Sequence, residues 1–377
     1  MSTRLKIVTV VGTRPEIIRL SSVIKLLDAH TELVLVHTGQ NYDYELNEVF
    51  FEDLGLRAPD HFLEADTSSL GTALGTIISG TEKVLQGEKP DAFLVLGDTN
   101  SCISALMAKR MKVPVFHMEA GNRSFDENVP EETNRRLVDH VSDYNLVYTE
   151  HGRRNLLAEG IHPSRILLTG SPMREVLEEN AEQIAASDAL QKQGLIPQGY
   201  FLVSLHREEN VDKPERLQAA VDTLEALHEK YDIPVLVSTH PRTKKRLEAL
   251  GVQEKEGFIF HPPFGFHDYI KLQKEAKLVL SDSGTISEES SILDFPAVTM
   301  RDFIERPESQ DTGAIIAAGL ESTDVLDAVE IALELFKSRR QSVVPSDYAI
   351  KDTSSRVVTY IRSTAHSHFQ RLGIRRI

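Results

Sequence analysis

Short apolar runs alternate with longer segments of helical periodicity along the chain of 377 residues. In the first half, apolar and β-branched runs predict strands at Leu5–Val11, Leu33–His37, Ala92–Leu96, Val115–Met118, Tyr144–Tyr148 and Ile166–Thr169. The intervening segments predict a helix from Pro15 toward Leu27 and further helices at Tyr44–Leu54, Leu70–Gln86, Ser101–Met111, Glu131–Val141 and Gly152–Glu159. This alternation is typical of a doubly wound parallel sheet.

The same alternation starts again after a polar, irregular segment, Glu178–Gly199, which we interpret as a linker with a helix of its own. The second half predicts strands at Tyr200–Leu205, Val235–Ser238, Phe258–His261 and Leu278–Ser281. Its predicted helices are Pro214–Lys230, Thr243–Leu250, His267–Glu275 and Ser287–Leu293. We therefore expect an α/β fold of two Rossmann-like doubly wound domains, residues 1–175 and 176–353, that face each other across a cleft. Ligands of such sheets bind at the carboxyl ends of the strands.

Composition narrows the class of function. Lys and Arg number 42 and Asp and Glu 57, so the net charge is −15, which argues against nucleic acid or an anionic membrane as partner. With one cysteine, Cys102, and no HxxxH or HExxH spacing, we expect neither a disulfide nor a metal site. Met1–Lys6 lacks the apolar core of a signal peptide and no apolar stretch is long enough for a membrane span, so we expect a cytoplasmic protein.

A polar turn, Gly12–Glu16, lies between the first strand and the first helix. The free N–H groups and the dipole at the start of a helix favour an anion, and Arg14 and Arg19 add charged donors suited to a phosphate. The alternative is a structural turn in which Arg14 pairs with Glu16 at the surface. The turn has neither the GxGxxG dinucleotide pattern nor a Walker-type loop.

Three acidic side chains occupy similar loop positions. Asp98 and Glu119 each follow a buried predicted strand, and Glu131 opens a helix directly after Pro130. Asp98 alone could be an N-cap, and an acid in a first helical turn is often only an electrostatic cap. Three acids at the cleft edge favour acid–base chemistry instead, because neighbouring carboxylates raise one another's pKa, so that one donates a proton while another accepts one.

Two histidines end strands of the second half. His206, in the stretch Leu205–Asn210, is a candidate phosphate ligand or acid–base group, and the alternative is a buried structural histidine. His240 ends the next strand in a similar way, although a turn histidine before a proline is commonly structural. No GxSxG motif supports a serine hydrolase.

The last two polar stretches suit a nucleoside diphosphate. Ser283 and Gly284 would present a hydroxyl and N–H groups to a diphosphate at a helix start, and Glu289 could bind both hydroxyls of a ribose. The alternative is an ordinary capped helix. Arg306, in the stretch Arg301–Glu308, is a further candidate anion ligand.

Six motifs in combination resemble the non-hydrolysing UDP-N-acetylglucosamine 2-epimerase family. They are GTRPE, GDT, HMEAGNR, PEETNRR, SDSG and ERPE, in family order within residues 5–308. The resemblance implies two Rossmann-like domains of the glycosyltransferase-B type and a final helix, Ser354–Ala365, that crosses back onto the first domain and forms part of a C-terminal segment, residues 354–377. It also implies a homodimer, a UDP-sugar substrate, and neither a metal nor a redox cofactor.

The resemblance further implies inversion of carbon 2 of the sugar, through loss of UDP and a 2-acetamidoglucal-like intermediate. Asp98, Glu119 and Glu131 match the essential acids of the family, and His206 matches the histidine near the diphosphate. The implied substrate and UDP contacts are Arg14, Arg19, Arg135, Tyr269, Ser283, Gly284, Glu289, Arg306 and Glu308. Tyr269 stands where the family often has a phenylalanine beside uracil.

The chain departs from the family pattern in two places. In many bacterial members a second UDP-N-acetylglucosamine binds as an activator at the stretch that corresponds to Gly39–Tyr44, and of that motif this chain retains only Gln40. The loop between Glu119 and Glu131 also lacks the usual aromatic insert. HMEAGNR and SDSGTISEESS more closely resemble the capsule and O-antigen branch, which forms UDP-N-acetyl-L-fucosamine from UDP-2-acetamido-2,6-dideoxy-L-talose. We expect UDP-N-acetylglucosamine as substrate, with the deoxytalose compound as the alternative.

Three other functions suit a UDP-sugar protein. A glycosyltransferase of this fold would need an acceptor and would not exchange the proton at carbon 2, and a hydrolysing 2-epimerase would release N-acetylmannosamine and UDP. A non-catalytic sensor would keep Ser283 and Glu289 without needing the acids. All three acids are present, which favours an enzyme.

Overall fold

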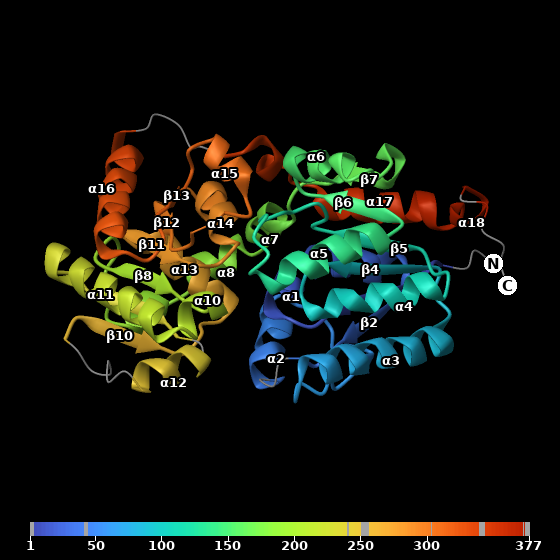
Figure 1. The fold of residues 1–377 in the computed structure, drawn as a ribbon, viewed down its shortest axis with the longest axis horizontal. Helices are drawn as coiled ribbons and strands as arrows, with labels where there is room; N and C mark the ends of the chain where they lie inside the picture. The colour runs from blue at the N-terminus through green and yellow to red at the C-terminus, as the bar shows by residue number, and fades with distance from the viewer. Residues whose placement is uncertain are drawn as a thin grey trace. The chain divides into compact units, whose positions relative to one another are not determined.

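The computed structural model describes residues 4–40, 44–239, 241–249, 256–302, 304–338, 344–371 and 373. The chain forms two compact units, which are Met1–Glu179 with Ser346–Ile377, called unit 1, and Asn180–Pro345, called unit 2. Each unit has a parallel sheet with helices on both faces (Figure 1). The predicted class of two Rossmann-like doubly wound domains is confirmed.

Unit 1 has a seven-stranded sheet in the order β3-β2-β1-β4-β5-β6-β7. The strands are β1 (Lys6–Val11), β2 (Glu32–His37), β3 (His61–Phe62), β4 (Ala92–Leu96), β5 (Val115–Met118), β6 (Tyr144–Val147) and β7 (Ile166–Leu168). The central strands are continuous apolar runs because helices cover the sheet on both faces. The strand order reverses direction between β1 and β4, and ligand sites of such sheets lie beside this switch point.

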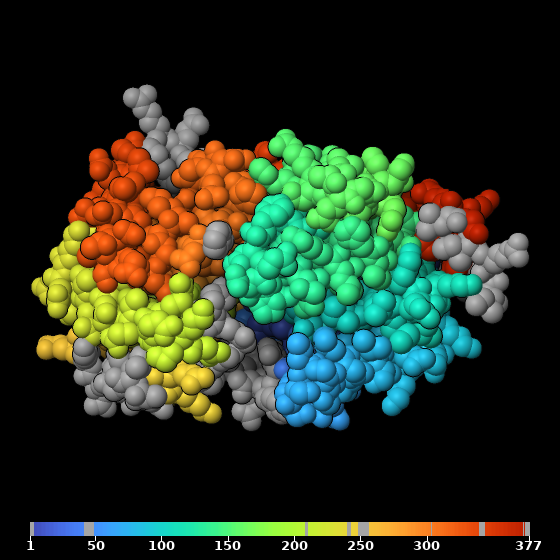
Figure 2. All heavy atoms as spheres, viewed as in Figure 1, coloured from blue at the N-terminus to red at the C-terminus, as the bar shows by residue number. Residues whose placement is uncertain are grey.

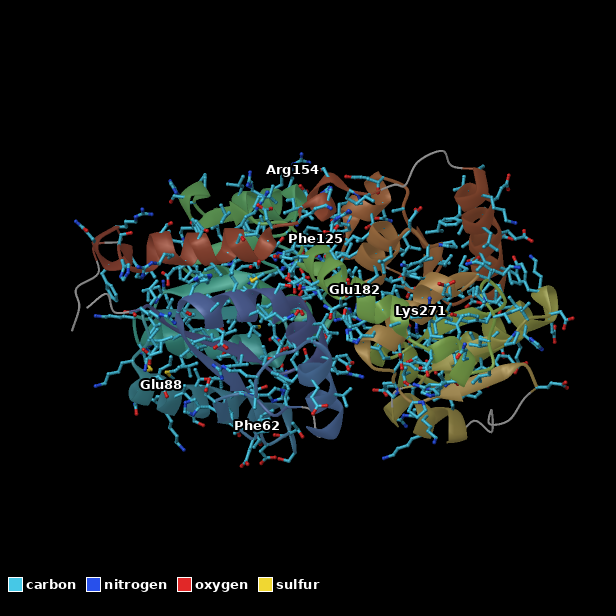
Figure 3. The ribbon with its side chains drawn as sticks, turned by 180° about the vertical axis from the view of Figure 1, so that it is seen from behind. Phe62, Glu88, Phe125, Arg154, Glu182 and Lys271 are labelled. Atoms are coloured by element: carbon cyan, nitrogen blue, oxygen red, sulfur yellow. The ribbon has the colours of Figure 1, made fainter. Side chains whose placement is uncertain are left out.

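Two helical layers enclose the sheet of unit 1. The layer nearer the viewer in Figure 1 contains α3 (Leu70–Glu88), α4 (Ser104–Arg110) and α5 (Pro130–Val141). The layer seen from behind in Figure 3 contains α1 (Arg14–His30) and α17 (Thr353–Ala365), which pack against each other. The remaining elements are α2 (Tyr44–Asp53), η1 (Asn100–Ile103), α6 (Glu150–Ala158), η2 (Pro163–Arg165), α7 (Met173–Glu179), η3 (Ser346–Ala349) and α18 (His368–Arg371).

Unit 2 has a six-stranded sheet in the order β10-β9-β8-β11-β12-β13. The strands are β8 (Phe201–Ser204), β9 (Val235–Ser238), β10 (Phe258–His261), β11 (Leu278–Ser281), β12 (Ala297–Thr299) and β13 (Ile316–Ala317). The helices are α8 (Ala181–Ala186), α9 (Ala189–Lys192), α10 (Glu208–Val211), α11 (Pro214–Tyr231), α12 (Pro241–Ala249), α13 (Phe266–Glu275), α14 (Ile286–Leu293), α15 (Pro307–Asp311) and α16 (Ser322–Ser338).

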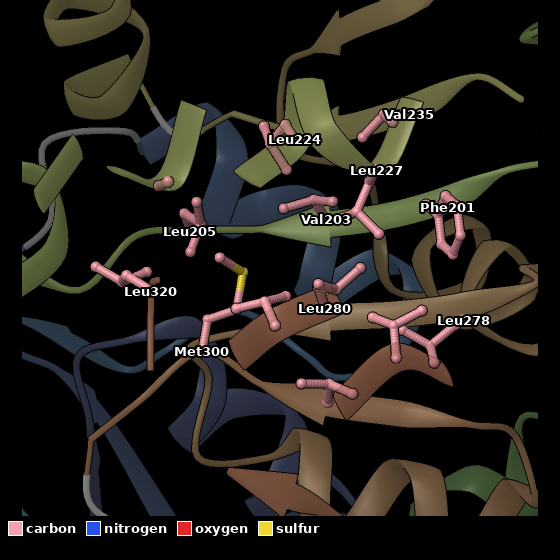
Figure 4. Packing of buried hydrophobic residues seen from close by; sticks show 14 of the residues in the cluster. Phe201, Val203, Leu205, Leu224, Leu227, Val235, Leu278, Leu280, Met300 and Leu320 are labelled. Atoms are coloured by element: carbon pink, nitrogen blue, oxygen red, sulfur yellow. The ribbon is translucent and has the colours of Figure 1, made fainter. Parts of the chain in front are cut away.

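One core cluster of unit 2 lies between its sheet and the helices α11 and α16. Val203, Leu280 and Met300 from the sheet region meet Leu224 and Leu227 of α11 there (Figure 4). The outer side of α16 forms part of the surface shown in Figure 2 and exposes half of Ile331. Val325, Ala328 and Val329 of α16 are buried in this cluster, so this side of the helix faces the sheet.

The structure changes several predicted elements. The predicted helix Ser101–Met111 is divided into a 3₁₀ turn, η1, and the α-helix α4, and the linker Glu178–Gly199 contains two short helices, α8 and α9. No element was predicted between Leu293 and Ser354, where the structure has β12, α15, β13, α16 and η3. The two strands are only two or three residues long, which is too short for a periodic signal. Among the helices of the described ranges, none combines the length and apolar character that a membrane span needs.

Candidate active site

One buried carboxyl group joins the first two motifs at the carboxyl ends of β1 and β4. Glu16 accepts hydrogen bonds from the N–H groups of Gly12 and Thr13, at 2.6 and 2.9 Å. It also accepts from the hydroxyls of Thr99 and Ser101, at 2.5 and 2.9 Å. Glu16 is 2% exposed, so the interpretation of a surface pair between Arg14 and Glu16 is wrong. Burial raises the pKa of Glu16 to about 7, against the opposing effect of these hydrogen bonds.

Glu119 is held in the loop that follows β5. Its carboxylate accepts from Nη1 of Arg19 on α1 and, at 3.2 Å, from the side-chain amide of Asn122. Both members of the Glu119–Arg19 ion pair are buried. The backbone of Glu119 is left-handed, with φ of 63°, which is costly for a residue with a Cβ and requires support from its surroundings.

Asp98 follows β4 and is paired with an arginine of the PEETNRR motif. Nη2 and Nε of Arg135 donate to the same oxygen of Asp98, at 2.6 and 3.0 Å. Nη1 of Arg135 donates to Glu132, at 3.0 Å, and the amide of Asn134 donates to the backbone carbonyl of Asp98. The start of α5 is therefore tied to the GDT loop, and the side chain of Asp98 keeps a quarter of its surface exposed.

Glu131 lies in the first turn of α5 and is half-buried. Its neighbour Glu132 is fully buried and accepts from the N–H and hydroxyl of Ser124, both at 3.0 Å. The loop between Glu119 and Glu131 carries one aromatic residue, Phe125, whose side chain is 72% exposed (Figure 3). The loop is thus fixed at Ser124 while Phe125 projects from it.

Arg14 lies at the start of α1, with its guanidinium 5.8 Å from the ring centroid of Phe50 on α2. The amide of Gln40 donates to the hydroxyls of Thr99 and Ser101, at 3.3 and 3.0 Å. The predicted departure at Gly39–Tyr44 includes residues 41–43, which lie outside the described residues.

The structure brings four of the six motifs together at the strand ends of unit 1. Glu16 contacts Thr99, Arg19 contacts Glu119, and Arg135 contacts Asp98. Asp98 and Glu119 each have an arginine as a direct neighbour, Arg135 and Arg19.

In unit 2, Asp282 organises the loop that carries His206. Asp282 is fully buried and accepts from the N–H groups of His206 and Arg207, at 3.1 and 3.0 Å. It also lies 3.0 Å from Nδ1 of His206 and 3.2 Å from the amide of Asn210. Burial acts to raise the pKa of Asp282, but the charge of His206 and the hydrogen bonds outweigh it, so the pKa is lowered.

Ser283 and Gly284 lie at the turn before α14. The hydroxyl of Ser283 is 2.9 Å from that of Thr285 and accepts from the Thr285 N–H at 3.3 Å, so it also supports the turn. A Cβ added at Gly284 would lie 3.7 Å from Nη2 of Arg207 and 3.6 Å from Oε2 of Glu305. A cationic side chain and an anionic one therefore border this glycine.

Glu289 is buried on α14, where it accepts from the amide of Gln273 on α13 at 2.6 Å. The hydroxyl of Tyr269 lies near the side chains of Ser204 and Gln273. Burial of that hydroxyl and the charge of Glu289 raise the pKa of Tyr269. Tyr269, Gln273 and Glu289 thus form one polar group between two helices.

The ERPE element is buried. Nη1 of Arg306 lies 3.8 Å from Oε1 of Glu288, and both side chains are almost fully buried. Glu308 is buried in the first turn of α15. Arg306 therefore has an acidic neighbour inside unit 2. The other candidate there, His240, lies outside the described residues.

Cys102 is a buried free thiol in η1, and burial raises its pKa well above the ordinary value. Within the described ranges, no three or more His, Cys, Asp or Glu side chains are grouped so that they could hold a metal ion. The expectation of no metal stays a prediction.

Sequence reasoning assigned no role to four residues that support these groups. Arg207, Gln273 and Asp282 adjoin candidate residues of unit 2, and Glu132 anchors Arg135 in unit 1. Arg207 and Asp282 stand directly beside His206 and Ser283 in the sequence, which was an available signal. Gln273 precedes Glu289 by sixteen residues, and only the packing of α13 near α14 reveals their contact.

A family model described as UDP-N-acetylglucosamine 2-epimerase matches residues 25–362. The structure is similar to that of UDP-N-acetylglucosamine 2-epimerase from Rickettsia bellii, with 46% identity and a TM-score of 0.92 over 99% of this chain and 100% of the other. It is also similar to UDP-GlcNAc 2-epimerase of Methanocaldococcus jannaschii in complex with UDP-GlcNAc and UDP, with 36% identity and a TM-score of 0.89 over 95% and 100%. A Pseudomonas aeruginosa UDP-2,3-diacetamido-2,3-dideoxy-D-glucuronate 2-epimerase is 36% identical over 87% of this chain and 92% of its own.

Proposed function

Because this chain belongs to the UDP-N-acetylglucosamine 2-epimerase family, we propose that it interconverts UDP-N-acetylglucosamine and UDP-N-acetylmannosamine without net hydrolysis. The observation that carries the proposal is the convergence of four motifs in unit 1, where Asp98 and Glu119 contact Arg135 and Arg19. The arginine partners hold the two carboxylates in place, and a positioned carboxylate can transfer a proton at a sugar carbon.

The reaction balances without an external oxidant or reductant. A carboxylate removes the proton from carbon 2, the bond from carbon 1 to UDP breaks, and a double bond forms between carbons 1 and 2. A proton is then delivered to carbon 2 on the opposite face while UDP adds back to carbon 1. We assign these proton transfers to Asp98, Glu119 and Glu131, each of which would contribute about 10²–10⁴-fold to the rate.

We assign the UDP moiety mainly to unit 2. Ser283 and Gly284 supply a hydroxyl and an N–H at the start of α14, next to Arg207, which suits a diphosphate. Asp282 occupies the Nδ1 side of His206, which leaves Nε2 as the ring nitrogen for contact with a ligand. Glu289 and Tyr269 are assigned to the ribose and uracil. Further assigned contacts, on the two units, are Arg14, Arg19, Arg135, Arg306 and Glu308.

The proposal also specifies which sugar the substrate carries. Names of relatives include both N-acetylglucosamine and a diacetamido glucuronate, which share UDP and a 2-acetamido group. The alternative substrate, UDP-2-acetamido-2,6-dideoxy-L-talose, also has that group. Elimination at carbons 1 and 2 is the same for all three, because it does not involve the substituents on carbons 3 to 6.

Proton NMR of UDP-N-acetylglucosamine with the protein in heavy water tests the proposal. We expect deuterium at carbon 2 together with UDP-N-acetylmannosamine. Exchange only with the 6-deoxy-L-sugar nucleotide would move the assignment to that substrate. Free N-acetylmannosamine would indicate a hydrolysing enzyme, and an absence of exchange with either nucleotide sugar would reject an epimerase.

We further propose a cytoplasmic homodimer, and the support for both points is family membership. Light scattering of the purified full chain would give the expected mass of about twice the 42.2 kDa of one chain. A mass of one chain would reject the dimer.

A further inference from the structure

His117, the first residue of the HMEAGNR motif, is fully buried and plays no part in the proposed reaction. Its Nδ1 lies 2.9 Å from Oδ1 of Asp139 on α5, and its Nε2 lies 2.8 Å from the backbone carbonyl of Gly97. Gly97 directly precedes Asp98. The imidazole therefore joins α5 to the loop that carries one of the three acids.

Asp139 extends this connection to the loop that carries Glu119. Its carboxylate accepts from the N–H of Gly121, at 3.1 Å, and from Nη1 of Arg123, at 2.8 Å. Arg123 also makes two hydrogen bonds of 2.7 Å with Glu159 at the end of α6. One buried carboxylate thus contacts both the histidine before Glu119 and the glycine after it.

The loop between these contacts has a costly backbone conformation. Glu119 and Gly121 both have left-handed φ values, 63° and 80°. A left-handed residue with a Cβ costs of order 1–3 kcal/mol and persists only where its surroundings enforce it. The contacts of Asp139 with His117 and Gly121 flank Glu119 and supply that enforcement.

Hydrogen-bond chemistry explains why a histidine is needed here. The Asp139 carboxylate and the Gly97 carbonyl lie on opposite sides of the imidazole, and the two ring nitrogens of a histidine are placed to reach both. Apolar side chains at this position satisfy neither acceptor. The side chains of asparagine and glutamine satisfy at most one of the two acceptors, because each has a single NH₂ group at one distance from the backbone.

We propose that His117 and Asp139 are positioning residues that set the Asp98 and Glu119 carboxylates relative to each other. The inference rests on the proposed function, since it assigns these two acids to the reaction. His117 acts on Asp98 through the Gly97 carbonyl, and Asp139 acts on Glu119 through Gly121. Neither residue is assigned a contact with substrate, so their loss should affect turnover and spare UDP binding.

The test compares His117→Ala, His117→Gln and Asp139→Asn in steady-state epimerisation by the full chain. We expect kcat to fall about 10²-fold for His117→Ala, which is the cost of a misplacement of about 1 Å. KM and the UDP dissociation constant should stay within about twofold, because the UDP contacts lie mainly in unit 2. His117→Gln should recover about tenfold in kcat, since its longer amide reaches toward Gly97.

His368→Gln is the matched control. His368 is also a buried histidine of unit 1, but its Nδ1 lies 3.2 Å from the hydroxyl of Tyr144 at the start of β6, at the opposite end of the strands from the acids. The His368→Gln substitution should lower the midpoint of thermal unfolding and leave kcat unchanged. An unchanged kcat in the His117 and Asp139 variants would overturn the proposal. So would an equal loss of kcat in His368→Gln, since turnover would then report stability alone.

Amide exchange separates this inference from the proposed function. Asp139→Ala removes the acceptor of the Gly121 N–H, so hydrogen exchange at Gly121 should accelerate in the absence of any ligand. If the wild type does not epimerise UDP-N-acetylglucosamine, the proposed function fails and this measurement still decides whether Asp139 holds the loop. Unchanged exchange at Gly121 would overturn the inference even in an active enzyme.

Discussion

Glu16 shows how a single side chain can join two loops. Its carboxyl group accepts from the backbone of Gly12 and Thr13 on one side and from the hydroxyls of Thr99 and Ser101 on the other. The capping box at the start of α1 is a local feature that the sequence contains. Its extension to the GDT loop depends on β1 and β4 being neighbours in the sheet.

The raised pKa of Glu16 predicts a pH-dependent stability. Because the folded pKa, about 7, lies above the ordinary 4.5, the native state binds this proton more tightly than the unfolded chain does. The contribution is fully present below pH 4.5 and is lost as the pH rises through 7. It corresponds to about 3 kcal/mol. Glu16→Gln cannot titrate and serves as the reference.

Urea unfolding of both proteins at several pH values measures this effect. The free energy of unfolding of the wild type, relative to Glu16→Gln, should fall by about 3 kcal/mol between pH 4.5 and pH 8. A difference that stays constant over this range would show that Glu16 titrates alike in the folded and unfolded states.

At the scale of elements, the loop after β5 packs closely on the first turn of α6. A Cβ added at Gly121 would lie 2.3 Å from the backbone carbonyl oxygen of Gly152. Gly160, which follows α6, has a similar left-handed φ of 85° but nothing within 4 Å of such a Cβ. A comparison of substitutions at the two glycines therefore distinguishes the cost of a left-handed backbone from the cost of a close contact.

We predict that Gly121→Ala destabilises the protein more than Gly160→Ala does. Both substitutions should cost roughly 1–2 kcal/mol for the left-handed backbone. Gly121→Ala should add a further cost of about 1–3 kcal/mol, because the backbone of Gly152 must move. Urea unfolding of the two variants measures the difference, and equal losses would contradict the close approach. Turnover should fall in Gly121→Ala alone, since that loop carries Glu119.

Strands of four or more residues were all predicted, whereas most shorter strands and the 17-residue helix α16 were not. The strands of five or six residues in unit 1 and the helix α11 were predicted at close to their observed bounds, because their period spans several repeats. The strands β3, β12 and β13 were missed; they are two or three residues long and pair with β2, β11 and β12, respectively. The 3₁₀ turn η1 was predicted as the start of an α-helix. In the structure the hydroxyl of Thr99 accepts from the N–H of Ser101 and caps this turn.

At the scale of the whole molecule, the acids of the proposed chemistry belong to unit 1 and most of the proposed UDP contacts belong to unit 2. Asp98→Asn should therefore lose at least about 10²-fold in kcat and keep its UDP affinity. Glu289→Ala should weaken UDP binding, since Glu289 is assigned to the ribose. Calorimetry with UDP and epimerisation kinetics of both variants measure the two effects. Full turnover in Asp98→Asn, or unchanged UDP affinity in Glu289→Ala, would reject the assigned roles.

The sequence by itself determined the alternating fold, the family and the candidate residues, because apolar periodicity and short motifs are local properties. Only the tertiary structure decided what each charged group contacts. The pairing of Asp98 with Arg135 spans 37 positions and that of Glu119 with Arg19 spans 100. The connections of His117 with Asp139 and Gly97 likewise span 22 and 20 positions. Such contacts arise when the strand order brings distant loops to one edge of a sheet, and no local pattern encodes that distance.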